Sequence, residues 1–386
     1  MKSIWMKIIV FLFFSLTLSG CWQAREAEIM DYVSAVGIDY KDGQFEVYTQ
    51  MLSFTVLSKQ EGGGSRQGTV PISIAKGTGK TVNNAINNLY SGAPKQIFWG
   101  HTTAMILSEG VMKEGLKEMI DLLNRHQQIR YSIWVYGTDQ TISDLFFITP
   151  TFEQSPLYSI LHNPIEPYVQ RAYIKPIKLH ELIAQLDEPG MIGVVPYLNA
   201  YNKEWLENEK AKETLFIDGV YAVNRDKLFG KLLNKDLSGL PWMGRKSFTS
   251  SQLQVYEGEN PAANVSIKHV KYNIKPIIQG DDVKFNVDIV LKGEVSSLLK
   301  HLSLKKLQTL AEERVEKQVF ATYHSGIDMD VDIYQLMHTM YKKDPKLFHQ
   351  LVSEDKLTLN SDSLQSVDVS VDITFSGKYK YFEEQP

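Results

Sequence analysis

Hydrophobic and polar positions alternate in two long stretches, one near each end of the chain. Residues 31–54 alternate on either side of Lys41-Asp42-Gly43, and residues 265–295 alternate on either side of Gly280-Asp281-Asp282. Alternation with a period of two is typical of a strand with one buried face, and Asp and Gly are favoured in tight hairpin turns. The pattern therefore predicts two β-hairpins.

Between these stretches the spacing of apolar residues first switches between strand and helix. Residues 70–75, 97–107 and 131–136 are predicted strands, and the second of these is apolar on both faces, as in the interior of a sheet. Residues 81–90 and 111–123 are predicted helices because their apolar residues recur every three to four positions. The order strand, helix, strand, helix, strand indicates a mixed α/β unit.

The segments that follow each of these regions are predicted to mix helices with further strands. Residues 138–186 are helical and interrupted by prolines, and they are followed by predicted strands at 194–200 and 215–223. After the second hairpin, residues 302–323 carry one apolar stripe at helical spacing, which predicts an amphipathic helix packed on the hairpin strands. Two shorter helices and a last strand complete the C-terminal part, at residues 333–341, 346–352 and 367–375.

We therefore expect an α+β fold of three mixed α/β domains with largely antiparallel sheets, preceded by a lipoprotein signal peptide. The expected divisions are a signal peptide at 1–20, an N-terminal α/β domain at 21–190, a small middle domain at 191–258 and a C-terminal α+β domain at 259–386.

The N-terminus is typical of an export signal. Lys2 and Lys7 form a positive segment, and residues 8–18 are uncharged and strongly apolar. This run is shorter than the roughly 20 residues that a membrane-spanning helix requires, which favours a signal peptide. Leu18-Ser19-Gly20-Cys21 resembles a bacterial lipobox, in which the cysteine thiol takes a diacylglycerol and becomes the mature N-terminus. We expect lipidation at Cys21 and a folded chain tethered outside a membrane.

Composition narrows the function classes further. The 386 residues include 41 Lys and Arg against 45 Asp and Glu, which gives a formal net charge of −4 and argues against a nucleic-acid-binding protein. Cys21 is the single cysteine of the chain, so internal disulfides and cysteine-rich zinc or iron–sulfur sites are excluded.

Two near-motifs do not complete a binding site. Gly77-Thr78-Gly79-Lys80-Thr81 resembles the end of a phosphate-binding loop, but Ile occupies position 74, where that loop needs a glycine. Asp328, Asp330 and Asp332 mimic the first half of a calcium loop, but Ile333 replaces the required glycine and Thr339 the required Glu. We expect a helix cap at Lys80 or Thr81 and helix capping by Asp330 or Asp332, with no cofactor and no metal.

No set of residues combines a nucleophile, a base and an orienting acid. Ser65 is followed by Gln67 where a nucleophile elbow needs glycine, and His180-Glu181 lacks the second histidine of a zinc-protease helix. His101, in a strand that we expect to be buried, is the histidine to examine, although a hydrogen-bonded core role is favoured. We therefore expect a protein that is not an enzyme.

Four groups of short motifs occur in order along the chain. They are Cys21-Trp22 with Arg25-Glu26 and Gly37-Ile38-Asp39, Gly79-Lys80-Thr81 with Ala85-Ile86 and Phe98-Trp99-Gly100-His101, Arg125 with Arg130, and Asp332-Ile333-Tyr334 with Pro345 and Phe348. Together these motifs resemble the C subunits of spore germinant receptors, the Ger(x)C lipoproteins. Gln23 and Phe348 depart from the family's usual Asp and Trp. The resemblance spans residues 21 to about 377.

The resemblance implies three α+β domains on a lipid anchor at the outer face of the inner spore membrane. It also implies assembly with a multi-spanning A subunit and a transporter-like B subunit, and a role in the response to small germinants without catalytic residues. Two alternatives from the residues alone are a lipid-anchored solute-binding protein of a transporter and an anchored wall hydrolase. The first needs two similar lobes around a cleft, and the second needs a carboxylate pair or a metal cluster that the sequence does not show.

Overall fold

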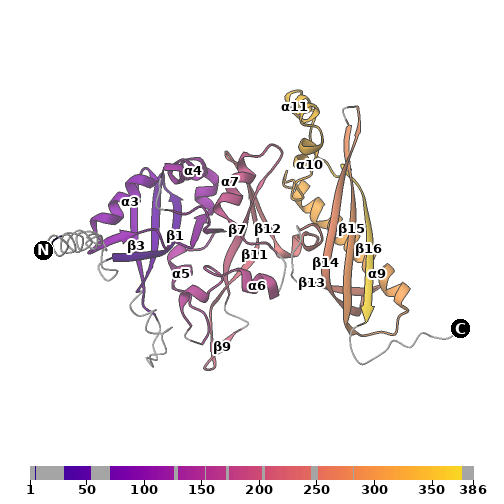
Figure 1. The fold of residues 1–386 in the computed structure, drawn as a ribbon, viewed down its shortest axis with the longest axis horizontal. Helices are drawn as coiled ribbons and strands as arrows, with labels where there is room; N and C mark the ends of the chain where they lie inside the picture. The colour runs from indigo at the N-terminus through magenta and orange to yellow at the C-terminus, as the bar shows by residue number, and fades with distance from the viewer. Residues whose placement is uncertain are drawn as a thin grey trace.

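The computed structural model describes residue 5 and residues 30–53, 70–125, 129–152, 154–170, 174–201, 205–244, 251–280 and 282–375. Apart from residue 5, the predicted signal peptide lies outside these residues, as does Cys21, the predicted lipidation site. Two large β-sheets organise the described residues, and they lie one after the other along the long axis of the molecule (Figure 1).

The first sheet has ten strands and a parallel centre. Its order is β12-β11-β8-β6-β5-β1-β2-β3, with β4 beside β1 and β7 beside β6. The pairs β1–β5, β5–β6 and β6–β8 are parallel, whereas the outer strands pair antiparallel. Its strands are β1 (Met30–Lys41), β2 (Gln44–Leu52), β3 (Ile72–Gly79), β4 (Gln96–Phe98), β5 (Ala104–Ser108), β6 (Trp134–Thr138), β7 (Ile177–Lys178), β8 (Gly193–Tyr201), β11 (Thr214–Val223) and β12 (Leu228–Leu233).

Helices cover both faces of the central strands. Residues Met105 and Leu107 of β5 pack with helices α3 (Val82–Ser91), α4 (Leu116–Arg125) and α7 (Leu179–Asp187), whereas Ala104 and Ile106 pack with α5 (Ile142–Phe147) on the other face. A short π-helix (Val111–Gly115) precedes α4. Because the residues of β5 are buried on both faces of the sheet, this strand has the continuous apolar run of a sheet interior.

The second sheet has four strands in the order β13-β14-β15-β16. Strand β13 (Ser251–Glu257) and the long hairpin β14 (Asn260–Gln279) and β15 (Asp282–Leu298) are antiparallel, and β16 (Leu364–Phe375) joins parallel to β15. Helix α9 (Leu304–Ile327) packs on this sheet and is followed by α10 (Leu336–Lys343) and α11 (Pro345–Ser353). The predicted stripe of α9 is confirmed from its second turn onward, with buried Leu307, Ala311, Val315, Val319 and Tyr323. Leu304, which also belonged to the predicted stripe, is 36% exposed at the start of the helix.

Specific contacts fix the two sheets relative to each other. The Gln335 side chain accepts from the Ile192 N–H at 3.0 Å and donates to the Ile192 carbonyl at 2.9 Å. His338 Nδ1, in α10, lies 3.0 Å from the Pro189 carbonyl oxygen. The short helix α8 (Leu240–Met243), which follows the first sheet in the chain, packs on the second part, where Trp242 donates through Nε1 to Gln318 Oε1 at 2.8 Å. Val220 and other residues of β11 and β12 join the hydrophobic core of the second sheet. The two parts therefore share one packed boundary.

Several expectations need correction. The single strand predicted at 97–107 is two strands, β4 and β5, separated by the turn at 99–103. Residues 138–186 include α5 and α7, but also a 3-10 helix (Pro156–Tyr158), the short helix α6 (Ile165–Gln170) and β7. The prolines of this segment limit regular helix because each lacks a backbone N–H donor.

The expected domain boundaries do not coincide with breaks between sheets. Strands on both sides of residue 190 belong to the ten-stranded sheet, and β13, which precedes residue 259, belongs to the four-stranded sheet. The mixed α/β character with mostly antiparallel pairing is confirmed, whereas the count of three domains stays a prediction.

Candidate functional site

The residues of the apparent phosphate loop serve helix packing. Gly77 and Gly79 lie within strand β3, where α3 crosses closely. A Cβ added at Gly77 would lie 2.1 Å from the Ala85 carbonyl oxygen, and one at Gly79 would lie 2.6 Å from the Ala85 nitrogen. Thr81 is the N-cap of α3, and its hydroxyl accepts from the Asn84 N–H at 3.1 Å. The predicted cap is confirmed, and the extended backbone through both glycines offers no cradle for phosphate.

The apparent calcium loop likewise supports a helix. Asp332 is 6% exposed, and its Oδ2 accepts from the Met337 N–H at 2.8 Å, in the first turn of α10. Burial raises the pKa of Asp332 to about 6, against the opposing effect of the backbone N–H groups that face it. The described part of the chain holds no group of three or more His, Cys, Asp or Glu side chains suited to a metal ion.

His101 and His180 do not meet the geometry of catalytic residues. His101 is exposed in the turn after β4, not buried as expected, and its ring centroid lies 5.1 Å from that of Tyr32. His180 Nδ1 lies 3.0 Å from the Tyr131 carbonyl oxygen, and Glu181 accepts from the Lys178 N–H at 3.0 Å near the start of α7. Ser65 lies outside the described residues.

A set of tyrosines and charged residues gathers at the carboxyl ends of β5 and β6, where α/β sheets often bind ligands. Asp139 accepts from Lys231 Nζ at 2.6 Å and from the Tyr197 hydroxyl at 2.8 Å, and the Tyr221 hydroxyl lies 3.4 Å from Glu109. Burial opposes ionisation of Asp139, but the hydrogen bonds from Lys231 and Tyr197 hold its pKa below the usual value. Because the carboxylate is ionised and paired with Lys231, the arrangement stabilises the strand ends.

A buried polar network holds the segment after α5 against the sheet. The His162 ring, 7% exposed, has Nδ1 2.6 Å from Thr103 Oγ1 and Nε2 2.9 Å from Gln50 Oε1. Gln50 Nε2 donates to the Phe146 carbonyl at 2.7 Å, and Ser34 Oγ donates to Gln50 Oε1 at 2.8 Å. Gln50 Oε1 is thus an acceptor, which assigns the proton of His162 to Nε2. Burial lowers the pKa of His162 to about 3, so the ring is neutral at pH 7.

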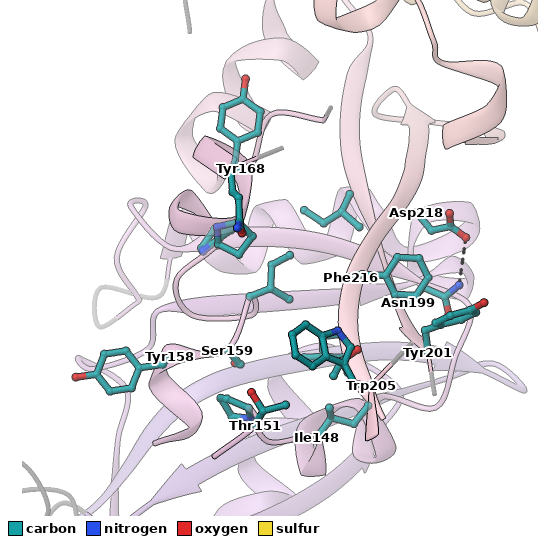
Figure 2. Close-up of a pocket in the computed structure, with 18 of the residues that line it drawn as sticks. Ile148, Thr151, Tyr158, Ser159, Tyr168, Asn199, Tyr201, Trp205, Phe216 and Asp218 are labelled. Atoms are coloured by element: carbon teal, nitrogen blue, oxygen red, sulfur yellow. Dashed lines mark hydrogen bonds between the residues drawn. The ribbon is translucent and has the colours of Figure 1, made fainter. Parts of the chain in front are cut away.

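The segment held by this network forms one wall of a groove of about 1020 Å³. The ends of β8 and β11, with Trp205 before the small hairpin of β9 (Leu206–Glu207) and β10 (Lys210–Ala211), supply the other wall. Figure 2 shows Trp205 between Phe216 and the loop that carries Thr151 and Ser159. The aromatic and proline residues that line the groove are Tyr158, Tyr168, Tyr201, Trp205, Phe216, Pro150, Pro164 and Pro167.

Sequence reasoning did not single out His162 or this groove. The network joins residues as far apart in sequence as Gln50 and His162, and no local pattern predicts such pairs. The prolines of the 138–186 segment were the only local signal, because they mark an irregular segment that carries surface side chains.

Among the described residues, no helix has both the length and the hydrophobicity required to cross a membrane.

Comparison with known proteins gives matches along most of the chain. A family model described as "Spore germination protein N-terminal domain" matches residues 23–200, and one described as "Spore germination B3/ GerAC like, C-terminal" matches residues 218–377. Spore germination protein KC of Bacillus subtilis (strain 168) is 20% identical over 87% of both chains. Spore germination protein GerQC of Bacillus cereus is 23% identical over 84% of this chain and 87% of the relative.

A further relative and a solved structure also match the chain. The putative spore germination protein YfkR of Bacillus subtilis (strain 168) is 26% identical over 229 residues, which cover 59% of this chain and 58% of that relative. The crystal structure of the GerBC protein aligns with a TM-score of 0.52 and 15% sequence identity, over 88% of this chain and 96% of that one. The similarity to GerBC shows a shared fold.

Proposed function

Because this chain belongs to the spore germination family whose N- and C-terminal models match it, we propose that it is the lipid-anchored C subunit of a nutrient germinant receptor. In this proposal it assembles with the A and B membrane subunits at the outer face of the inner spore membrane, and spores need it in order to respond to germinant. The observation that carries the proposal is the match of both family models, in order, at residues 23–200 and 218–377.

Lipidation at Cys21 would supply the attachment to the membrane. Each buried CH₂ contributes about 0.8 kcal/mol, and a single acyl chain binds only marginally, so a diacylated cysteine with a further chain gives a durable anchor. Metabolic labelling with a fatty-acid probe tests this step. We expect the wild-type chain to be labelled and Cys21→Ala to be unlabelled and released from membranes; equal labelling of the two would contradict the anchor.

The anchor supports a role in assembly. Tethering two proteins to one bilayer raises their effective concentration, so a docking surface of modest affinity suffices. We place that surface on the four-stranded sheet, on the face opposite α9. This face carries ion pairs between neighbouring strands, with Lys275 Nζ 2.5 Å from Asp288 and Lys268 Nζ 2.6 Å from Glu294. Val290, at its centre, is 44% exposed.

One observation favours the alternative of a lipid-anchored solute-binding protein, namely the aromatic groove of about 1020 Å³. Such proteins bind solute between two similar lobes, whereas the two sheets of this chain have ten and four strands in unrelated orders. The receptor subunit therefore remains the better-supported function.

Co-isolation from spore membranes separates the two functions. A tagged wild-type chain, solubilised in mild detergent, should retain the A and B subunits in comparable amounts. A matched variant with Lys275→Glu and Asp288→Lys keeps the net charge and the ion pair while it reverses the local pattern, and it should retain less of both. Recovery of an ABC permease and its ATPase, without the A and B subunits, would contradict the proposal.

A further inference from the structure

The groove presents aromatic faces beside one carboxylate. Trp205 is 51% exposed and Tyr201 is 36% exposed, and the Tyr201 and Phe216 rings meet edge to face with centroids 5.5 Å apart. Asp218 is the one charged side chain that lines the groove among the described residues. Figure 2 places its carboxylate near Asn199 on the side of the groove that carries Phe216.

The carboxylate of Asp218 is held in place by amide groups. Asn199 Nδ2 lies 3.4 Å from Asp218 Oδ2, and Asn234 Nδ2 lies 3.4 Å from Asp218 Oδ1. Both amides are oriented by stronger bonds, since Asn199 Oδ1 accepts from the Ala200 N–H at 2.8 Å and Asn234 Nδ2 donates to the Ile217 carbonyl at 3.0 Å. No salt bridge to Asp218 occurs within the described part of the chain. The half-buried carboxylate is thus fixed with spare acceptor capacity.

Aromatic faces attract cations through the negative charge of the π-system, and a nearby carboxylate adds a direct charge interaction. A neutral ligand would leave this carboxylate without a charged partner, and an anion would be repelled. We propose that the groove binds an organic cation, with a protonated or quaternary ammonium group held between Asp218 and the rings of Tyr201, Trp205 and Phe216. The hydrocarbon part of the ligand would pack on the proline side of the groove.

The same chemistry has two sources, a free small molecule and a lysine side chain on another protein. Isothermal titration calorimetry of the full-length lipidated protein in detergent distinguishes the two sources. The cationic probes are choline and Nα-acetyl-lysine-N-methylamide, which keeps its charged ε-ammonium group. The uncharged isostere of choline, 3,3-dimethylbutan-1-ol, is the control for shape, and N-acetylglucosamine tests a neutral sugar. We expect the preferred cation to bind at least about tenfold more tightly than the isostere.

Two substitutions locate the site. Asp218→Asn, which keeps the shape of the side chain, should weaken cation binding at least about tenfold, and Asp218→Glu should restore part of it. Trp205→Leu should weaken it by between about two- and thirty-fold, the range expected for a ring-to-cation contact. Asp226→Asn, in an exposed turn, and Phe147→Leu, exposed outside the groove, are controls for charge and for aromatic content and should bind as wild type does.

Several results would overturn the proposal. They are equal binding of choline and its isostere, binding of the sugar but of neither cation, no binding of either cation at concentrations up to roughly 50 mM, and cation binding unchanged by Asp218→Asn. A thermal melt of each variant confirms that it is folded. This proposal is independent of the assembly role, because binding of the probes is measured without the A and B subunits.

Discussion

The ten-stranded sheet is covered by helices on both faces, whereas the four-stranded sheet is covered by α9 on one face and carries charged residues on the other. In the first sheet, successive residues such as Ala104 and Met105 of β5 are both fully buried. In the second, buried residues of β15 such as Val287 and Ile289 alternate with half-exposed ones such as Asp288. The first sheet therefore positions loops and the aromatic groove at its edge, whereas in the second the described residues place no helix over the face opposite α9.

The largest loss of stability is expected from a substitution in α9, on the covered face of the four-stranded sheet. Leu307 of α9 is fully buried, so Leu307→Ala removes apolar contacts and leaves a cavity. We expect a loss of about 2–5 kcal/mol in the free energy of unfolding. Leu304→Ala, on the same helix but 36% exposed, is the matched control and should cost less than about 1 kcal/mol. Equal losses in denaturant unfolding would show that α9 does not hold this sheet.

The second-largest effect is a pH dependence of stability that arises from Asp332, near the boundary between the two sheets. Its folded-state pKa of about 6 exceeds the ordinary value of 3.8. The folded chain then binds more protons than the unfolded chain between these values, so this residue makes the fold less stable as pH rises from 4 to 7. Relative to wild type, the free energy of unfolding of Asp332→Asn should rise by about 2 kcal/mol between pH 4 and pH 7. Unfolding at both pH values, with exposed Asp330→Asn as control, checks this; a constant difference would contradict it.

A smaller effect is expected from the close packing of α3 on the ten-stranded sheet. Gly77→Ala places a Cβ against the backbone of α3, which cannot move without disturbing its own hydrogen bonds, and should cost about 1–3 kcal/mol. Gly92→Ala, at the end of the same helix, meets no heavy atom within 4 Å and is the control. If both variants unfold at the same denaturant concentration, the glycine is not a packing contact.

The smallest effect is expected on the open face of the second sheet. Lys275 and Asp288 form an ion pair in which both side chains are more than one third exposed. A double-mutant cycle with Lys275→Ala and Asp288→Ala should give a coupling below about 1 kcal/mol that decreases as salt is added. A larger, salt-independent coupling would mean that this face is a structural element and not a surface left open to a partner.

The sequence predicts the second sheet better than the first because the second sheet is buried on one face, whereas the central strands of the first are buried on both. Alternation and the α9 stripe reveal a sheet with one buried face, and the turn of its long hairpin at Gly280, with a φ angle of 64°, follows from a residue type that tolerates positive φ. The interior strands lack alternation, so residues 97–107 gave no sign of the turn that separates β4 from β5. Likewise, the groove and the His162 network depend on pairs such as Gln50 and His162, which only the folded chain brings together.

The most direct test of the receptor-subunit account is germination of spores that lack this chain. Spores from a deletion strain without a paralogue, challenged with the matching germinant, should fail to respond. Wild-type protein should restore the response, whereas Cys21→Ala and a secreted, unanchored form should not. Normal germination of the deletion spores, or full restoration by the unanchored form, would contradict the account of a lipid-anchored subunit that acts by assembly at the membrane.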